Sequence, residues 1–333
     1  MDQTLRYIGA AAIIIFVLMG ILTVVALIAD DSEGSEEEQT EVKTLPTVEK
    51  KDTAHVVVSQ PLETDPYEEL NSLIGLDDVK KEVEALSNYV KVQKARKEKG
   101  LKTRHLSYHL VFTGNPGTGK TTVARIVARI YKDLGILKKG HLVETDRAGL
   151  VAGYVGQTAI KTNQLVDSAL NGVLFVDEAY SLVPNNRSED YGQEAIATLL
   201  KRMEDDRDSL VVIIAGYTDE MKKFIDSNPG LKSRFTRYIH FPDYSADELM
   251  SIFELYMKKD EYQLTTEAKG YVLEAFRKKI AQNDRNFGNA RYARNKFERA
   301  IQIQANRLSK IRKPTKDELS TLTLEDVQKA FGL

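Results

Sequence analysis

Cysteine is absent from this chain of 333 residues. Its absence excludes disulfide bonds, cysteine-ligated metal sites and thiol catalysis, and it says little about the compartment. Histidine is scarce, and its five positions are scattered without the spacing of metal ligands. A large excess of charge of one sign is also missing, because the formal net charge is only −2. No overall field therefore draws the chain to nucleic acid, and a nucleic-acid partner is not expected.

The N-terminal region contains one long apolar run. Ile8 to Ala29 carries no charged residue. As a helix, such a run would reach about 33 Å, which exceeds a hydrocarbon core of about 30 Å. We therefore predict a single transmembrane anchor over residues 1–29. A cleaved signal peptide is the alternative, although its apolar region is usually shorter and its N-terminus more basic.

Two arguments about the orientation of this anchor oppose each other: the charges beside the span and the need for ATP. Arg6 precedes the span and acidic residues follow it. Counting basic residues places the N-terminus in the cytoplasm, but this rests on one arginine. A domain that uses ATP needs a compartment that contains ATP. We therefore expect a short external N-terminus, with the body of a single-pass cell-membrane protein in the cytoplasm.

The segment of residues 30–66 is acidic, rich in Glu, Thr, Ser and Lys, and poor in apolar side chains. Such a composition favours a flexible linker with a reach on the order of 30–35 Å. Val56, Val57 and Val58 form its one apolar run. This run is either a strand that docks on the folded body or an incidental patch.

A phosphate-loop pattern, G-x-x-x-x-G-K-[ST], lies between an apolar strand and an amphipathic helix predicted over Val123 to Leu134. Glycines let the backbone wrap so that its N–H groups face an anion, and the helix N-terminus adds its dipole. Lysine can reach the β and γ phosphates of ATP, and the threonine hydroxyl can bind Mg²⁺. An ordinary glycine-rich turn is the alternative. The predicted nucleotide-binding residues are Gly114, Asn115, Pro116, Gly117, Thr118, Gly119, Lys120, Thr121 and Thr122.

Two adjacent carboxylates, Asp177 and Glu178, follow the apolar run Val173 to Val176. In parallel sheets, ligands bind at the carboxyl ends of the strands. Asp177 is predicted to hold Mg²⁺ together with Thr121, and Glu178 to polarise the attacking water as a general base. A strand followed by a solvated acidic turn is the alternative.

Short apolar segments alternate with helical patterns from about Tyr67 onward, which predicts an α/β fold with a parallel sheet of five strands buried on both faces. A further helix carries Val79 and Val83 on its buried face and Asp77 as its N-cap. After Asp243 the pattern is helical. The predicted strands are Leu110–Thr113, Leu142–Thr145, Val173–Val176, Leu210–Ala215 and Tyr238–Phe241; the predicted C-terminal helices are Ala246–Lys259, Thr266–Gln282, Asn289–Lys310 and Leu324–Phe331.

The chain from about Tyr67 to Leu308 resembles the AAA+ ATPases, and most closely the CbxX/CfxQ family. The resemblance rests on Gly114–Thr121, Val173–Glu178, Leu150–Thr158, Ala215–Tyr217 and Asn228–Phe235. It implies a nucleotide-binding α/β subdomain over residues 67–243 and a helical lid over residues 244–333. It also implies ATP and Mg²⁺ as cofactors and a homo-oligomeric ring, typically a hexamer.

The resemblance also implies residue roles. Arg234 would be an arginine finger that reaches the γ-phosphate of a neighbouring subunit, with Arg237 second in order. The lid arginine that senses nucleotide would be Arg291 in Gly288–Arg291, with Arg294 second. Many AAA+ members have an asparagine where this chain has Ala215–Thr218, which leaves Tyr217 and Thr218 as candidates for orienting the water. Ile74 and Gly75 resemble the segment that lies against adenine.

Tyr154, Val155 and Gly156 match the aromatic–hydrophobic–glycine pore loop of the family. In a ring, such a loop would contact a passing polypeptide; a buried loop tyrosine is the alternative. The function predicted is therefore a membrane-anchored AAA+ ATPase that remodels or threads a protein substrate. The second hypothesis is an ATP-switched scaffold of a membrane-associated complex of the secretion or sporulation type.

Overall fold

The computed structural model describes residues 56–59, 64–103, 107–154, 156–183 and 191–332. The predicted anchor, Ile8–Ala29, lies outside these residues. Within the ranges just given, no helix is both long and apolar enough to span a membrane.

A sheet of six strands lies at the centre of the α/β part of the described chain, in the order β1-β3-β4-β5-β2-β6. Five of these strands, β2 to β6, pair in parallel, as the alternating pattern predicted. Strands β2, β4 and β5 are buried along their whole length, and β3 is buried at all but one residue. The bounds are β2 Leu110–Gly114, β3 Leu142–Thr145, β4 Gly172–Val176, β5 Leu210–Gly216 and β6 Arg237–Phe241.

The sixth strand, β1, corrects the prediction of an all-parallel sheet of five strands. β1 covers Val57–Ser59 and pairs antiparallel with β3, Val57 lying opposite Glu144 and Ser59 opposite Leu142. The segment that the composition marked as a flexible linker thus contributes an ordered strand. The physical reason is that β3 would otherwise be an edge with unpaired backbone groups, and a short antiparallel segment satisfies them. Of the two interpretations of the valine run, docking is the correct one.

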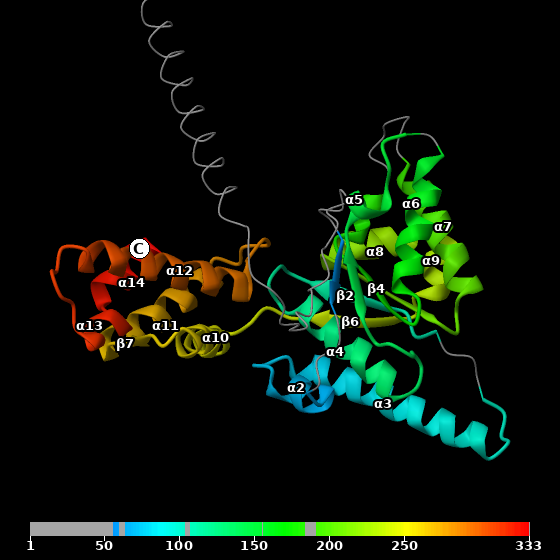
Figure 1. Cartoon of the computed structure of the whole chain (residues 1–333), viewed down its shortest axis with the longest axis horizontal. Helices are drawn as coiled ribbons and strands as arrows, with labels where there is room; N and C mark the ends of the chain where they lie inside the picture. Colours follow the sequence, from blue (N-terminus) through cyan, green and yellow to red (C-terminus); the bar gives the residue numbers. More distant parts are fainter. Residues whose placement is uncertain (1–55, 60–63, 104–106, 155, 184–190, 333) are drawn as a thin grey trace, which may run out of the picture. The chain divides into compact units, whose positions relative to one another are not determined.

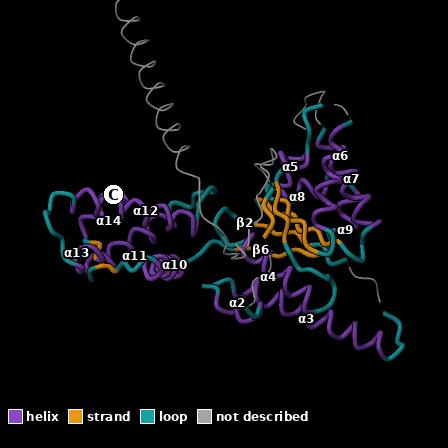
Figure 2. The backbone as a smooth tube through the Cα atoms, viewed as in Figure 1, coloured by secondary structure: helices purple, strands orange, loops and turns teal. Residues whose placement is uncertain are grey.

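Helices cover both faces of the sheet, so that two separate apolar cores form. The first face packs against α3 (Asp77–Glu98) and α4 (Lys120–Asp133), with α2 (Pro66–Ser72) against α4. The second face packs against the remaining helices of this subdomain, as Figure 1 shows, and the strands stack between the two helical layers in Figure 2. These are α5 (Arg147–Leu150), α6 (Gln157–Ala169), η1 (Ala179–Leu182), α7 (Gly192–Asp205), α8 (Thr218–Asp226) and α9 (Pro229–Arg234).

The start of α3 differs from the prediction. Asp77 is the first helical residue, not the N-cap. The cap position is Leu76, whose φ of 58° is left-handed and whose side chain is buried. Leu76 therefore turns the chain sharply to enter the core, and Asp77 instead supports the helix dipole from the first turn.

After Asp243 the chain is helical, as predicted, and the four expected helices begin where the pattern placed them. An aromatic cluster holds them together: Phe253 stands edge-on to Phe276 and to Phe297, with ring centroids 6.1 and 5.6 Å apart. The elements are α10 Ala246–Lys259, β7 Gln263–Leu264, α11 Thr266–Ala281, α12 Asn289–Leu308, α13 Lys316–Ser320, β8 Thr321–Leu322 and α14 Leu324–Phe331.

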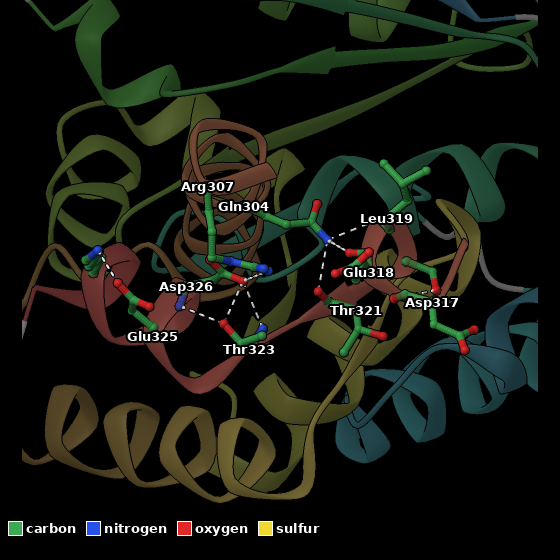
Figure 3. A network of polar contacts seen from close by, with 11 residues as sticks. Gln304, Arg307, Asp317, Glu318, Leu319, Thr321, Thr323, Glu325 and Asp326 are labelled. Carbon is green, nitrogen blue, oxygen red and sulfur yellow. Dashed lines mark hydrogen bonds and ion pairs between the residues drawn. The ribbon is translucent and has the colours of Figure 1, made fainter. Parts of the chain in front are cut away.

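A buried carboxylate ties the last helix to α12. Asp326, with no exposed side-chain surface, accepts from Arg307 Nη2 at 2.8 Å and from the Thr323 backbone N–H at 2.9 Å (Figure 3). Burial alone would raise the pKa of Asp326, but the hydrogen bonds from Arg307 and Thr323 outweigh it, and the pKa lies below its usual value. Next to this pair, the Gln304 amide donates to the carbonyls of Glu318, Leu319 and Thr321.

We predict that Asp326→Asn lowers the stability of the lid by about 1–3 kcal/mol, because Arg307 is then left partly buried without its counter-charge. The matched control is Glu325→Gln, because Glu325 pairs with the exposed Lys329 on the next turn and its loss should leave the protection of α14 close to that of the wild type. Hydrogen exchange of the α14 amides measures both. Equal protection in the two variants would contradict the prediction.

Candidate functional site

The predicted phosphate loop lies between the end of β2 and the start of α4. Gly117 and Gly119 have φ values of 72° and 95°, which side chains rarely adopt. A Cβ on Gly117 would stand 2.2 Å from the Gly288 carbonyl oxygen, so this position also lacks the space for one. Glycine is therefore required twice, once by backbone conformation and once by contact with the lid.

The shape of the loop is fixed from within. The buried Thr118 hydroxyl donates to the Asn115 carbonyl at 2.8 Å, and Lys120 Nζ donates to the carbonyls of Gly114 and Asn115, both at 2.8 Å. Burial lowers the pKa of Lys120, while the nearby carboxylates of Asp177 and Glu178 act in the opposite direction. The ammonium is thus partly desolvated and lies within electrostatic reach of both predicted carboxylates.

Both of these carboxylates follow β4, at the carboxyl end of the strand. The Asp177 backbone N–H donates to the Thr145 carbonyl at 2.8 Å, and Asp177 Oδ1 accepts from the Glu178 N–H at 3.0 Å. Glu178 has a left-handed φ of 48°. Such backbone strain in a non-glycine residue is typical of functional sites, where the surrounding structure imposes it. Here the strained residue is the one at which the chain leaves Asp177 and enters the short 3₁₀ helix η1.

The carboxyl end of β5 contributes Tyr217, one of the two candidates for orienting water. Burial, and then the charge of Glu178, raise the pKa of Tyr217, and the Arg291 guanidinium lowers it. Tyr217 therefore lies within electrostatic reach of both. Its ring is 6.0 Å from that of Tyr180, whose pKa burial and Glu178 also raise. Thr218, the other candidate, is the first residue of α8.

The lid contacts the loop through the N-terminus of α12. The Ala290 backbone N–H donates to the Gly117 carbonyl at 3.1 Å. Asn289, fully buried and left-handed at φ 46°, donates to Asp243 Oδ1 at 2.7 Å and accepts from the Tyr244 N–H at 2.9 Å. Asp243 also accepts from the Asn115 amide at 2.9 Å. Sequence reasoning missed Asp243 and Asn289; their only sequence signal was their position beside the predicted lid boundary and beside Arg291.

The two lid arginines differ in their surroundings. Arg291 follows directly in this turn, and its charge acts on both Lys120 and Tyr217. Arg294 instead pairs with Glu298 on the exposed side of α12, at 2.8 Å. The structure thus brings Arg291, and not Arg294, to the loop.

The segment expected against adenine, Ile74 and Gly75, lies in the turn between α2 and α3. Gly75 has φ 59°, and a Cβ there would overlap the Glu248 side chain of α10. The next residue, Leu76, lies close to Gly119. The structure therefore places this turn between the loop and the lid.

The predicted pore-loop residues precede α6. Tyr154 has 74% of its surface exposed, which excludes the buried-tyrosine alternative. Gly156 precedes α6 with φ 75° and has open space around it, and Val155 lies outside the described residues.

Arg234, at the end of α9, pairs with Glu204 of α7 at 3.2 Å, and its carbonyl accepts from the Ser107 hydroxyl at 2.6 Å. It lines a cavity of about 740 Å³ together with the buried His109. Burial, and then the charge of Arg234, lower the pKa of His109 to about 4, so this histidine is neutral at physiological pH. Its Nδ1 accepts from the Val212 N–H at 3.0 Å, which makes it a structural group. Arg237, second in order as a finger, stacks on the Tyr89 ring at 5.5 Å.

Comparison with known proteins agrees with this geometry. The profile of the ATPase family associated with various cellular activities (AAA) matches residues 110–243, and the AAA lid domain matches residues 245–332. A chloroplastic ribulose bisphosphate carboxylase/oxygenase activase from Cyanidioschyzon merolae is 44% identical over 260 residues, covering 78% of this chain and 88% of that protein.

The chain belongs to the AAA+ ATPases.

Its relatives carry names that belong to several different processes. Stage V sporulation protein K of Bacillus subtilis is 41% identical over 263 residues, covering 78% of this chain and 80% of that protein. The ESX-3 secretion system protein EccA3 of Mycobacterium tuberculosis H37Rv is 44% identical over 276 residues, covering 78% of this chain but 44% of that protein. The crystal structure of the FIGL-1 AAA domain in complex with ADP has a TM-score of 0.56 at 18% identity, covering 86% of this chain and 91% of that chain; it shows the shared fold.

As an AAA+ ATPase, the protein hydrolyses ATP and uses Mg²⁺. The residues present fit both. The loop offers the backbone N–H groups of the first turn of α4, which lack acceptors within the helix, and a desolvated ammonium. Thr121 and Asp177 supply a hydroxyl and a carboxylate, and oxygen donors of this kind suit Mg²⁺.

Proposed function

We propose that this AAA+ ATPase works as a ring that remodels a protein substrate next to a membrane. The observation that carries the remodelling part is the exposed Tyr154, held out on the loop before α6 by the chain itself. With 74% of its surface exposed, Tyr154 packs little against its own chain and is accessible to a partner. A flat, largely apolar ring of this kind can contact a passing polypeptide with little dependence on sequence.

Within one subunit, the described residues divide the chemistry as follows. The loop N–H groups and Lys120 bind the phosphates, and Arg291 adds a second positive charge from the lid. Bound Mg²⁺ would neutralise phosphate charge, held by Thr121 and Asp177. Glu178, whose left-handed backbone lies directly after Asp177, would accept a proton from the attacking water.

Arg234 would complete the site of a neighbouring subunit. Within the chain Arg234 pairs with Glu204 of α7, and the buried face of α7 packs on the sheet. Arg234 lies at the end of α9 and is not among the charged groups that shift the pKa of Lys120. A finger supplied in trans would make hydrolysis depend on assembly, which is what a ring motor requires.

The membrane part of the proposal rests on the sequence of Ile8–Ala29. An anchor at that position would restrict the ATPase to the reach of the following segment. We propose a cytoplasmic body, because the enzyme needs ATP.

The relatives include a Rubisco activase, a sporulation protein and a secretion-system protein. These different tasks on a shared core support remodelling as the common activity. They leave the substrate of this chain to be identified through the polypeptide that contacts Tyr154.

Glu178→Gln is expected to bind ATP but to hydrolyse it at least about 100-fold more slowly, because the amide cannot accept the water proton. Binding is measured with a fluorescent ATP analogue and turnover by phosphate release. The same variant separates the two functions: a motor loses its activity in cells lacking the native gene, whereas an ATP-switched scaffold keeps it. Full complementation by Glu178→Gln would therefore refute the motor.

Tyr154→Ala is expected to keep at least about half of the ATPase rate and to lose cellular function, because the substitution removes the aromatic contact with the substrate and leaves the nucleotide site intact. Tyr154→Phe, which keeps the aromatic face, should complement. Arg234→Ala should lose both turnover and function. Complementation by Tyr154→Ala would remove the threading proposal, and normal turnover of Arg234→Ala would remove the finger.

A reporter enzyme fused after Leu333 tests the membrane proposal. A reporter that works only in the cytoplasm should be active and should sediment with membranes, and deletion of Ile8–Ala29 should release it to the supernatant. Activity restricted to a reporter that works outside the cytoplasm would contradict the orientation, and sedimentation unaffected by the deletion would contradict the anchor.

A further inference from the structure

Glu144, on β3, connects the phosphate loop to strand β1. Its Oε1 accepts from the Thr121 hydroxyl at 3.4 Å, and its Oε2 accepts from Arg125 Nη2 at 2.7 Å. The same guanidinium donates through Nε to the Ser59 hydroxyl of β1 at 3.1 Å. A continuous series of polar contacts thus leads from Thr121 to the segment that precedes the ATPase core.

The Thr121 hydroxyl needs such a partner if it is to bind a metal ion. A hydroxyl has one proton and two lone pairs. If its proton is donated to Glu144, the lone pairs are free to face Mg²⁺. If the proton has no acceptor, the hydroxyl rotates among several orientations and only some of them suit a metal ion.

The carboxylate of Glu144 is itself held in place. Its side chain is only 24% exposed, so its charge is partly desolvated and needs compensation. Arg125 supplies the compensation and, because it occupies one oxygen, leaves the other for Thr121. A planar guanidinium that also bonds Ser59 cannot easily turn away.

Strand β1 braces this arrangement from outside. Val57 pairs directly opposite Glu144 in the ladder. One helical turn after Arg125, the buried Arg129 donates to the Thr64 carbonyl at 2.5 Å and pairs with Glu69. Positions four apart lie on the same face of a helix. The helix that begins at the phosphate loop therefore holds the preceding segment at two places, and only the first of them reaches Glu144.

We propose that Glu144 is a positioning residue for Mg²⁺–nucleotide binding, and that β1, through Ser59 and Arg125, completes it. Two consequences follow. The Mg²⁺ requirement of nucleotide binding depends on a segment that lies before the ATPase core. By reciprocity, Mg²⁺–nucleotide strengthens the docking of β1. The proposal rests on the use of ATP and Mg²⁺, and is independent of remodelling and of the membrane anchor.

The test is a Mg²⁺ titration of mant-ADP binding to the full chain, followed by fluorescence. Glu144→Gln and Arg125→Ala should raise the Mg²⁺ concentration at half-saturation about tenfold, and Ser59→Ala about two- to threefold, as expected for loss of charge-assisted and neutral hydrogen bonds. Affinity measured in EDTA should change less than affinity with Mg²⁺, which a general loss of folding would not produce.

Glu69→Gln is the matched control, because it also replaces a carboxylate that pairs with an arginine of α4, but it does not touch Glu144. Its half-saturating Mg²⁺ concentration should lie within about twofold of wild type. An unchanged Mg²⁺ requirement in Glu144→Gln, or an equal rise in Glu69→Gln, would overturn the positioning role. An unchanged requirement in Ser59→Ala would overturn the part played by β1.

Hydrogen exchange at Val57–Ser59 gives a second readout that does not depend on activity. Mg²⁺–ADP should slow exchange of these amides several-fold in the wild-type chain and by less in Glu144→Gln, because the link from Thr121 to β1 is weakened. Exchange that ignores Mg²⁺–ADP in the wild-type chain would overturn the reciprocal coupling.

Discussion

The carbonyl and amide groups of one glycine turn, Gly117 to Gly119, are the constraint on which the rest of the structure depends. A phosphate cradle built from backbone N–H groups requires that side chains be absent and that the backbone be held from outside. Here β2 holds the turn from behind, α4 continues it, and the Ala290 N–H bonds the Gly117 carbonyl from the lid. Because the lid forms a hydrogen bond with the loop itself, a movement of the loop on nucleotide binding would change the position of the N-terminus of α12.

Around this turn, charges are placed by elements that are far apart in the sequence. Lys120 is desolvated and is influenced by Asp177 from β4 and by Arg291 from the lid. Asp243 receives amide donors from both Asn115 and Asn289, and so joins the loop to the lid through one carboxylate. Partial burial strengthens the interactions of Lys120 and Asn289, and both side chains have hydrogen-bond partners that hold them in place before a nucleotide binds.

Sequence patterns predicted the parallel part of the sheet well, because its strands are continuously apolar and are separated by helices with a clear period. They also predicted the lid helices, whose caps are strong: Ser245 with Glu248 and Thr323 with Asp326 form capping boxes. At β1 they left a docking strand and an incidental patch open, since a run whose Val57 and Val58 are exposed has no pattern of its own and becomes a strand only because β3 offers an open edge. They failed at Asp77, where the buried Leu76 decides how the chain enters the helix.

By itself, the sequence determined which groups could bind a nucleotide, since glycines, Lys120, Thr121, Asp177 and Glu178 lie at spacings that only a strand–loop–helix arrangement uses. Tertiary structure decided which of the other residues join them. It brought Arg291 to the loop and left Arg294 on the surface, and it placed Glu144 and Asp243 beside residues of the loop. The reason is physical, because the local periodicity of a sequence shows only which side chains face a core. A contact between residues more than 100 positions apart, such as Asn115 with Asp243, depends on the order of the strands in the sheet and on the turn of the chain at Asn289. Local periodicity contains neither of these.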